Sequence, residues 1–156
     1  MSQQATTYGS VKNITSSPIV YQISKDWQGA VGSGDLKSYP VQIQPSATGT
    51  FEHVGNENGS QAAVVYSVTN SAGKAYDVLL AWFNQPNSPN KAYTLIDEAG
   101  SFTTDRWPGI FNTLINSSKK SASTVGRCTS EVEIEEGNFP KFSVTIKFCL
   151  TACVKG

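Results

Sequence analysis

The feature that most constrains the fold is a pair of apolar segments joined by a short polar turn. Residues 61–69 (QAAVVYSVT) and 74–83 (KAYDVLLAWF) carry apolar side chains on both alternating faces. Successive side chains of a strand point to opposite faces of a sheet, so these segments are expected to be central strands covered on each side. The linking residues 70–73 (NSAG) predict a hairpin turn in which Gly73 has a positive φ.

The C-terminal third predicts a second hairpin with a different pattern. Apolar residues alternate with charged or polar ones on both sides of the sequence EGNFP; the apolar set is Val132, Ile134, Phe142, Val144, Ile146 and Phe148. A period of two predicts half-buried strands, each with one face on the core and one face toward solvent. Matching the apolar faces places Cys128 with the core set and Cys149 on the opposite, charged face.

Other short apolar segments predict strands near residues 10–14, 19–24, 40–44, 48–54 and 92–96. Residues 26–38, which contain Trp27, are expected to form a long loop rich in Gly and Ser. Eight or more short strands at regular spacing indicate a mainly β chain, folded as one antiparallel β-sandwich domain over residues 1–156.

One segment, residues 105–118 (DRWPGIFNTLINSS), has helical spacing. Its large apolar residues are Trp107, Ile110, Phe111, Leu114 and Ile115. This spacing predicts a short amphipathic helix that covers an end or a face of the sheets. Asp105 is expected to cap its amino end, with Pro108 in the first turn.

Charge and hydropathy exclude several classes of function. The chain has 12 Lys plus Arg and 12 Asp plus Glu, for a formal net charge of zero, and it lacks the clustered basic residues that bind nucleic acid. The start, MSQQATTYGS, does not resemble a secretory signal, and no window approaches eighteen consecutive apolar residues. We therefore expect a soluble, cytoplasmic protein with no transmembrane segment and no nucleic-acid partner.

Neither a metal site nor a catalytic motif is recognisable. The three cysteines, Cys128, Cys149 and Cys153, are expected to be free thiols, and one histidine leaves too few ligands for zinc. That histidine, His53, falls within a predicted strand, where a structural or surface role is favoured over a catalytic one. The motifs GxSxG, Walker A and HExxH are absent from the sequence. We expect a non-enzymatic protein that needs no cofactor.

Aromatic residues provide the candidate ligand site. Trp27, Tyr39 and Trp107 lie in or beside predicted loops, and Tyr93 lies in a predicted strand. Such side chains make stacking surfaces for sugars or amphipathic anchors at a lipid interface. If they form a loop-end binding site, they should be exposed to solvent. The alternative is that each of them plugs an end of the sandwich.

The ordered blocks DWQG, YPVQI, TFEHV, GSQAAVVYSVTNSAGKAYDVLLAW, NKAYTLI and DRW resemble the plant jasmonate-induced protein family. The resemblance covers about residues 8–118 and implies a stress-inducible protein. A weaker, architectural resemblance to actinoporins, aegerolysins and fungal fruit-body lectins implies a compact β-sandwich that engages membranes or sugars.

Two functional hypotheses follow. The first is a stress- or defence-associated protein that binds carbohydrate or lipid headgroups through the candidate aromatic residues. The second is a membrane-damaging toxin of the aegerolysin or actinoporin kind. The oligomeric state is not indicated by any of these patterns.

Overall fold

The structure is a computed structural model, and it describes residues 5–32 and 38–148. In chain order the elements are β1 (Thr6–Ile14), β2 (Ile19–Gln28), β3 (Ala30–Val31), β4 (Gln42–Ile43), β5 (Thr48–Val54), β6 (Ser60–Thr69), β7 (Ala75–Asn84), β8 (Lys91–Glu98), a 3-10 turn (Thr104–Arg106), α1 (Trp107–Ile115), β9 (Lys120–Val125), β10 (Cys128–Ile134) and β11 (Lys141–Phe148). The predicted fold class, a mainly β sandwich with a short amphipathic helix, is confirmed.

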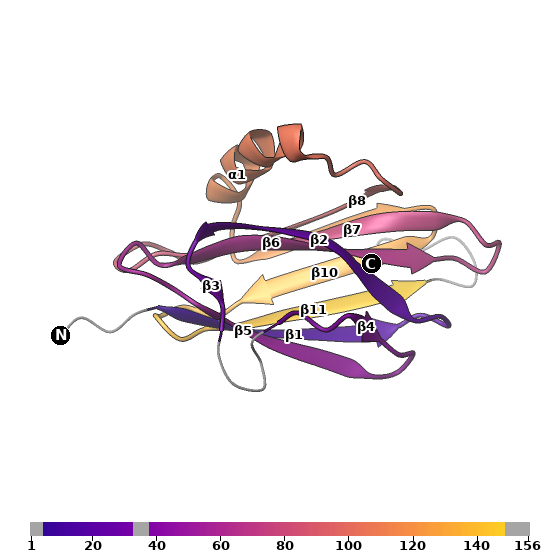
Figure 1. Cartoon of the computed structure of the whole chain (residues 1–156), viewed down its shortest axis with the longest axis horizontal. Helices are drawn as coiled ribbons and strands as arrows, with labels where there is room; N and C mark the ends of the chain where they lie inside the picture. Colours follow the sequence, from indigo (N-terminus) through magenta and orange to yellow (C-terminus); the bar gives the residue numbers. More distant parts are fainter. Residues whose placement is uncertain (1–4, 33–37, 149–156) are drawn as a thin grey trace.

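The strands form two sheets packed face to face, as Figure 1 shows. The six-stranded sheet has the order β3-β5-β1-β11-β10-β9, and the five-stranded sheet has the order β4-β2-β6-β7-β8. Neighbouring strands are antiparallel except for β1 and β11, which pair in parallel at the centre of the six-stranded sheet. The expectation of a purely antiparallel sandwich is therefore corrected at one pair, which joins the first and last of the described strands.

The main core lies between the sheets and is centred on Trp82, which is fully buried. The ring of Trp82 lies 5.1 Å from Phe51 and 5.2 Å from Phe142, so it contacts side chains of the opposite sheet. Cys128 belongs to this core, as the alternation predicted. Both predicted hairpins are confirmed, because β10 pairs with β11 and β6 pairs with β7, and the 70–73 turn has Gly73 at φ +84°.

The outer face of the five-stranded sheet is covered by α1, drawn above β6, β7 and β8 in Figure 1. Ala63 and Val65 of β6 face the helix, which explains why this strand is apolar on both faces. The predicted helix and its covering role are confirmed, but the predicted cap is wrong. Arg106 is the N-cap residue and makes no side-chain cap hydrogen bond, while Asp105 accepts a hydrogen bond from the Thr103 hydroxyl.

Two strands and extensions of two other strands were not predicted. β1 begins at Thr6 rather than near residue 10. β9 has the sequence KSASTV, which lacks the large apolar side chains that mark a strand, and β3 has only two residues. Residues 26–28 were expected to begin a loop, but they continue β2 to Gln28. This correction places Trp27 on a strand rather than in a loop.

The open edge of β8 is closed by side chains of β9. The backbone N–H groups of Thr94 and Ile96 donate to the hydroxyls of Ser121 (3.2 Å) and Ser123 (3.1 Å). The alternating serines of β9 therefore satisfy edge donors that would otherwise be free to pair with another strand.

Cys128 should be unreactive in the folded protein. Burial raises the pKa of its thiol to about 12, so the nucleophilic thiolate is scarce at neutral or mildly basic pH. We expect iodoacetamide to leave Cys128 unmodified under native conditions and to alkylate it after denaturation, as read by peptide mass spectrometry. Rapid native alkylation of Cys128 would contradict the burial. Cys149 and Cys153 lie outside the described residues.

Candidate functional site

The candidate site is a groove between the exposed edge of β2 and the helix α1. It has a volume of about 720 Å³ and is lined by Ile23, Ser24, Lys25, Trp27, Thr104, Trp107, Pro108 and Phe111. Apolar and aromatic side chains form most of its wall. Thr104 and Lys25 add a hydroxyl and an ammonium group, whereas the Ser24 hydroxyl is directed away from the groove, 2.7 Å from the hydroxyl of Tyr21. Such a lining suits a ligand with an apolar part and a polar or anionic part.

Trp27 is presented to this groove by an irregularity in β2. Asp26 pairs with Ala62 and Gln28 pairs with Gln61, so Trp27 between them has no partner on β6. An extra residue of this kind is a β-bulge, which bends the strand and redirects a side chain. The Trp27 ring lies on the helix side of the sheet, against α1, 4.9 Å from Phe111 and 6.2 Å from Trp107.

The structure thus brings together two of the four predicted site residues, Trp27 and Trp107. Trp107 is only 6% exposed, whereas Trp27 is half-buried. The two rings meet edge to face on one side of the five-stranded sheet, not at a loop end. Phe111 completes the cluster, and its helical spacing after Trp107 was the only sequence signal for its position.

Tyr39 lies elsewhere, which corrects the expectation that it is exposed beside a loop. It is 8% exposed and belongs to the core between the sheets, where its ring lies 5.0 Å from Phe51. Burial, followed by the charge of Asp26, raises the pKa of its hydroxyl far above the usual range. Tyr39 therefore contributes to the core rather than to the groove.

Tyr93 lies on the other side of α1 from Trp27. It lines a smaller groove of about 250 Å³ together with Leu95, Asp105, Arg106, Gly109, Ile110 and Thr113. The pKa of its hydroxyl is raised by partial burial, and the charge of Arg106 opposes that shift. The four predicted site residues are thus divided among two grooves and the core.

His53 forms a buried polar network that the sequence did not reveal. Its Nδ1 lies 2.7 Å from Ser60 Oγ, and its Nε2 lies 2.8 Å from Asp26 Oδ1. These are the residue types of a hydrolytic triad, but Ser60 and His53 are fully buried. Ser60 Oγ also accepts hydrogen bonds from Thr7 and Trp82, so it is not available to attack a substrate. The structural interpretation of His53 agrees with this geometry.

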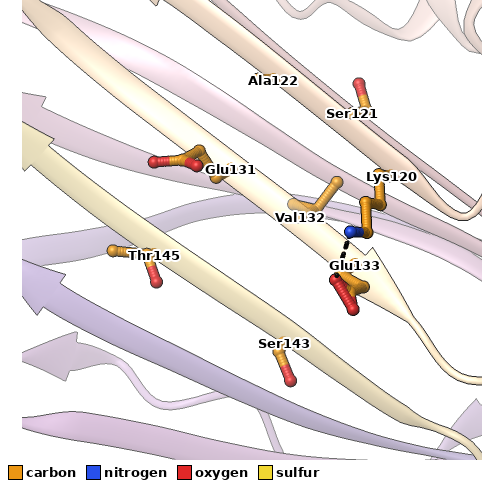
Figure 2. Close-up of a pocket in the computed structure, with 8 residues that line it drawn as sticks. All are labelled: Lys120, Ser121, Ala122, Glu131, Val132, Glu133, Ser143 and Thr145. Atoms are coloured by element: carbon orange, nitrogen blue, oxygen red, sulfur yellow. Dashed lines mark ion pairs between the residues drawn. The ribbon is translucent and has the colours of Figure 1, made fainter. Parts of the chain in front are cut away.

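A second, polar depression lies on the outer face of the six-stranded sheet, which no helix among the described residues covers. Figure 2 shows its lining, drawn from β9, β10 and β11: Lys120, Ser121, Ala122, Glu131, Val132, Glu133, Ser143 and Thr145. Lys120 and Glu133 form an ion pair across it at 3.5 Å. No aromatic side chain lines it. Hydroxyl and carboxylate groups of this kind can hydrogen-bond a sugar, although the depression offers no stacking surface.

The described residues, 5–32 and 38–148, contain no group of three or more His, Cys, Asp and Glu side chains able to hold a metal ion. Within the same residues, no helix has the length and apolar character needed to cross a bilayer.

Together, the two packed sheets and the covering helix define a helix-covered β-sandwich with an aromatic groove beside the helix. The chain belongs to the Nakanori-like protein family, whose model matches residues 3–148.

Solved structures and a curated sequence support this assignment. The fold matches the crystal structure of the lipid binding protein Nakanori with a TM-score of 0.82 and 16% identity, over 93% of this chain and 72% of that chain. It matches the Xerocomus chrysenteron lectin XCL with a TM-score of 0.55 and 10% identity, over 90% and 99%. At these identities the likeness shows a common fold.

A jasmonate-induced protein homolog of Atriplex canescens is 33% identical over 107 residues, which are 65% of this chain and 56% of that protein. The chain thus spans little more than half the length of this relative. The resemblance to jasmonate-induced proteins seen in the sequence is confirmed.

Proposed function

We propose that this chain is a non-enzymatic, stress- or defence-associated protein that binds membrane lipids through the groove between β2 and α1. The observation that carries the proposal is Trp27, which a bulge turns toward Trp107 and Phe111 while leaving it half-buried. Aromatic side chains in this situation suit the boundary between a lipid headgroup and its acyl chains. Lys25 at the rim supplies a positive charge for a phosphate.

The comparisons support the same class of function. Nakanori, which shares the fold, is a lipid binding protein by name, and the Atriplex canescens relative is named as jasmonate-induced. A carbohydrate ligand is the second candidate, because the hydroxyl and carboxylate groups of the polar depression in Figure 2 could bind a sugar. A lectin also shares the fold.

Replacing Trp27 with alanine should weaken binding to phospholipid vesicles by about thirtyfold, the effect of losing about 2 kcal/mol at an aromatic anchor. The matched control is Tyr8→Ala, because Tyr8 is an exposed aromatic residue (42%) on the uncovered outer face of the six-stranded sheet. This control should bind as the unmodified protein does. The measurement is vesicle co-sedimentation across several lipid compositions, with circular dichroism to verify that both variants fold.

If the Trp27→Ala variant binds vesicles as tightly as the unmodified protein does, the groove is not the lipid-binding site. Binding to a glycan array but to no vesicle would favour the carbohydrate candidate, and Glu133→Gln would then test the polar depression. Vesicles loaded with a fluorescent dye distinguish simple binding from the membrane-damaging alternative, since only the latter releases the dye.

A further inference from the structure

The helix α1 covers the outer face of the five-stranded sheet only in part. It buries Trp107, Ile110 and Leu114 against the sheet. Large apolar side chains at the border of this cluster remain half-buried; among the described residues they are Ile23, Trp27, Tyr93, Leu95, Phe111 and Ile115. Two of them come from β2 and two from β8, which lie on opposite sides of β6 and β7. Partly exposed apolar surface therefore borders α1 on both of its long sides.

The outward face of α1 carries no charge. None of the nine helix residues, WPGIFNTLI, is acidic or basic. The positions exposed to solvent are Pro108, Gly109, Asn112 and Thr113, followed by Asn116 directly after the helix. A helix on the surface of a globular protein typically has charged and polar residues on its outer face. The outer face of α1 has polar groups without charges, which are cheaper to remove from water than ionised groups are.

Two of these outward polar side chains are bonded to the helix itself. The hydroxyl of Thr113 donates to the carbonyl of Gly109 at 3.1 Å, and the amide of Asn116 donates to the carbonyl of Asn112 at 2.8 Å. Side chains that bond back to a carbonyl four residues earlier have fewer donors left for water. Covering this face would therefore leave fewer polar groups without a partner, which is the main cost of burying polar surface.

Charged side chains on this side of the molecule lie at the borders of α1. Asp105 and Arg106 precede the helix, and Arg106 forms an ion pair with Asp97 at 3.1 Å. Lys91 donates to a backbone carbonyl just after the helix at 3.4 Å. Lys25 lines the groove on the β2 side. The middle of the helix face is thus uncharged, and basic groups lie at its edges.

The opposite face of the sandwich has a different character. The outer face of the six-stranded sheet lies on the far side of the molecule from α1 (Figure 1). Several of its strands carry outward charged side chains: Lys12, Lys120, Glu131, Glu133, Lys141 and Lys147. Lys120 pairs with Glu133 at 3.5 Å, and Lys147 pairs with Glu131 at 3.0 Å. Ionised groups of this density strongly favour contact with water.

We propose that α1 and the apolar side chains on both of its sides form one membrane-contact face, which lies flat on the headgroup region of a phospholipid bilayer and leaves the six-stranded sheet in water. The proposal rests on the proposed lipid-binding function and extends it from a groove to a whole face. Its specific consequence is that Tyr93 and Asn112, which do not line the groove beside β2, also contribute to binding.

The composition of the face favours a bilayer as its partner. Trp27 on one side of α1 and Tyr93 on the other have an apolar ring and a polar group, the combination found where proteins meet the boundary between headgroups and acyl chains. Lys25 and Lys91 at the edges have long apolar stems that can place their ammonium groups beside lipid phosphates. The uncharged polar residues of α1 suit the depth of the headgroups rather than that of the hydrocarbon.

Paramagnetic NMR tests the orientation. The ¹⁵N-labelled protein is bound to phosphatidylcholine nanodiscs that contain a gadolinium-chelating lipid, and the broadening of each backbone amide signal is measured. A flat orientation predicts strong broadening for residues 109–116 and comparable broadening for β2 and β8 on either side of the helix. Residues 141–147 of β11, in the opposite sheet, should broaden least. Broadening of β2 without β8 would show that the protein binds edge-on through the groove alone, and would overturn the proposal.

Two substitutions outside the groove test the contribution of the face. Asn112→Asp should weaken binding to phosphatidylcholine vesicles by about tenfold, because it adds a charge that must lose water. Asn138→Asp makes the same chemical change in the turn between β10 and β11 and should leave binding unchanged. Tyr93→Ala should weaken binding by about fivefold, the effect of losing about 1 kcal/mol at an interfacial ring. Circular dichroism verifies that each variant folds.

The outcomes separate this proposal from the proposed function. Loss of vesicle binding in Trp27→Ala, with full binding in Asn112→Asp and Tyr93→Ala, would overturn the flat orientation and leave the groove as the lipid site. No binding of the unmodified protein to vesicles of phosphatidylcholine, alone or mixed with phosphatidylserine, would overturn both. Concentration-dependent broadening of residues 109–116 without lipid, together with a dimer in sedimentation, would assign the face to a second copy of the chain and overturn the proposal.

Discussion

Replacing Trp82 with alanine should destabilise the fold by about 3 to 5 kcal/mol, the usual cost of deleting a large aromatic side chain from a core. Trp82 is fully buried at the centre of the sandwich and contacts Phe51, Phe142 and the ring of His53. The surrounding strands belong to two paired sheets and cannot close over the space. Urea denaturation followed by circular dichroism measures the change in the free energy of unfolding.

Trp82→Phe is the matched control for that experiment. It retains an aromatic ring and loses mainly the indole N–H, which donates to Ser60 at 3.2 Å. The loss of one buried hydrogen bond is worth about 1 to 2 kcal/mol, so this variant should be clearly more stable than Trp82→Ala. If alanine cost less than phenylalanine, the central position of Trp82 in the core would be wrong.

The second large effect is expected at Gly59, in the connection between β5 and β6. Gly59 has φ +107°, and a Cβ added there would lie 2.1 Å from the carbonyl oxygen of Asn84, at the end of β7. Alanine would therefore be strained in its backbone and would collide with backbone atoms rather than with a movable side chain. Left-handed strain of about 1–2 kcal/mol and overpacking of about 1–3 kcal/mol predict a loss of roughly 3 kcal/mol.

Gly73→Ala separates the two contributions. Gly73 also has a positive φ, +84°, but nothing lies within 4 Å of an added Cβ. This variant should lose only about 1 kcal/mol, which corresponds to the backbone strain alone. Thermal unfolding of the two variants in parallel gives the comparison, and equal losses would show that the close approach to Asn84 does not matter.

The sequence predicted those parts of the fold that periodicity encodes. β6 and β7 were found from apolar residues on both faces, and β10 and β11 were found from strict alternation. β9 was not predicted, because its alternating residues are small and polar. They satisfy the edge of β8 through hydroxyl groups instead of filling the core, so they leave no hydrophobic signal.

The candidate site was harder to predict, because its geometry depends on which strands become neighbours. Trp27 and Trp107 were both identified as aromatic candidates, but their contact requires α1 to lie across the sheet that contains β2. The sequence DWQG was predicted to begin a loop, but it contains a β-bulge at the end of β2. A bulge interrupts the alternation of a strand, and so does the start of a loop. Tyr39 follows the loop predicted at residues 26–38, yet its ring enters the core, and local pattern does not encode that direction.

The His53 network could not be predicted for the same reason. Asp26, His53 and Ser60 come from three strands in two sheets, and no spacing in the sequence relates them. The available signal was the presence of one histidine within an alternating strand. That signal indicated a structural role without indicating its partners.

The parallel contact between β1 and β11 has a consequence for how the protein is made. The two strands occupy the middle of their sheet, so β5 on one side and β10 on the other are joined only through them. During synthesis β1 can pair early with β5, but its parallel neighbour β11 (Lys141–Phe148) emerges much later. Contacts between residues so distant in sequence slow folding. The six-stranded sheet of the nascent protein therefore stays incomplete until β11 has emerged, and this is the interval in which assistance from chaperones would matter most.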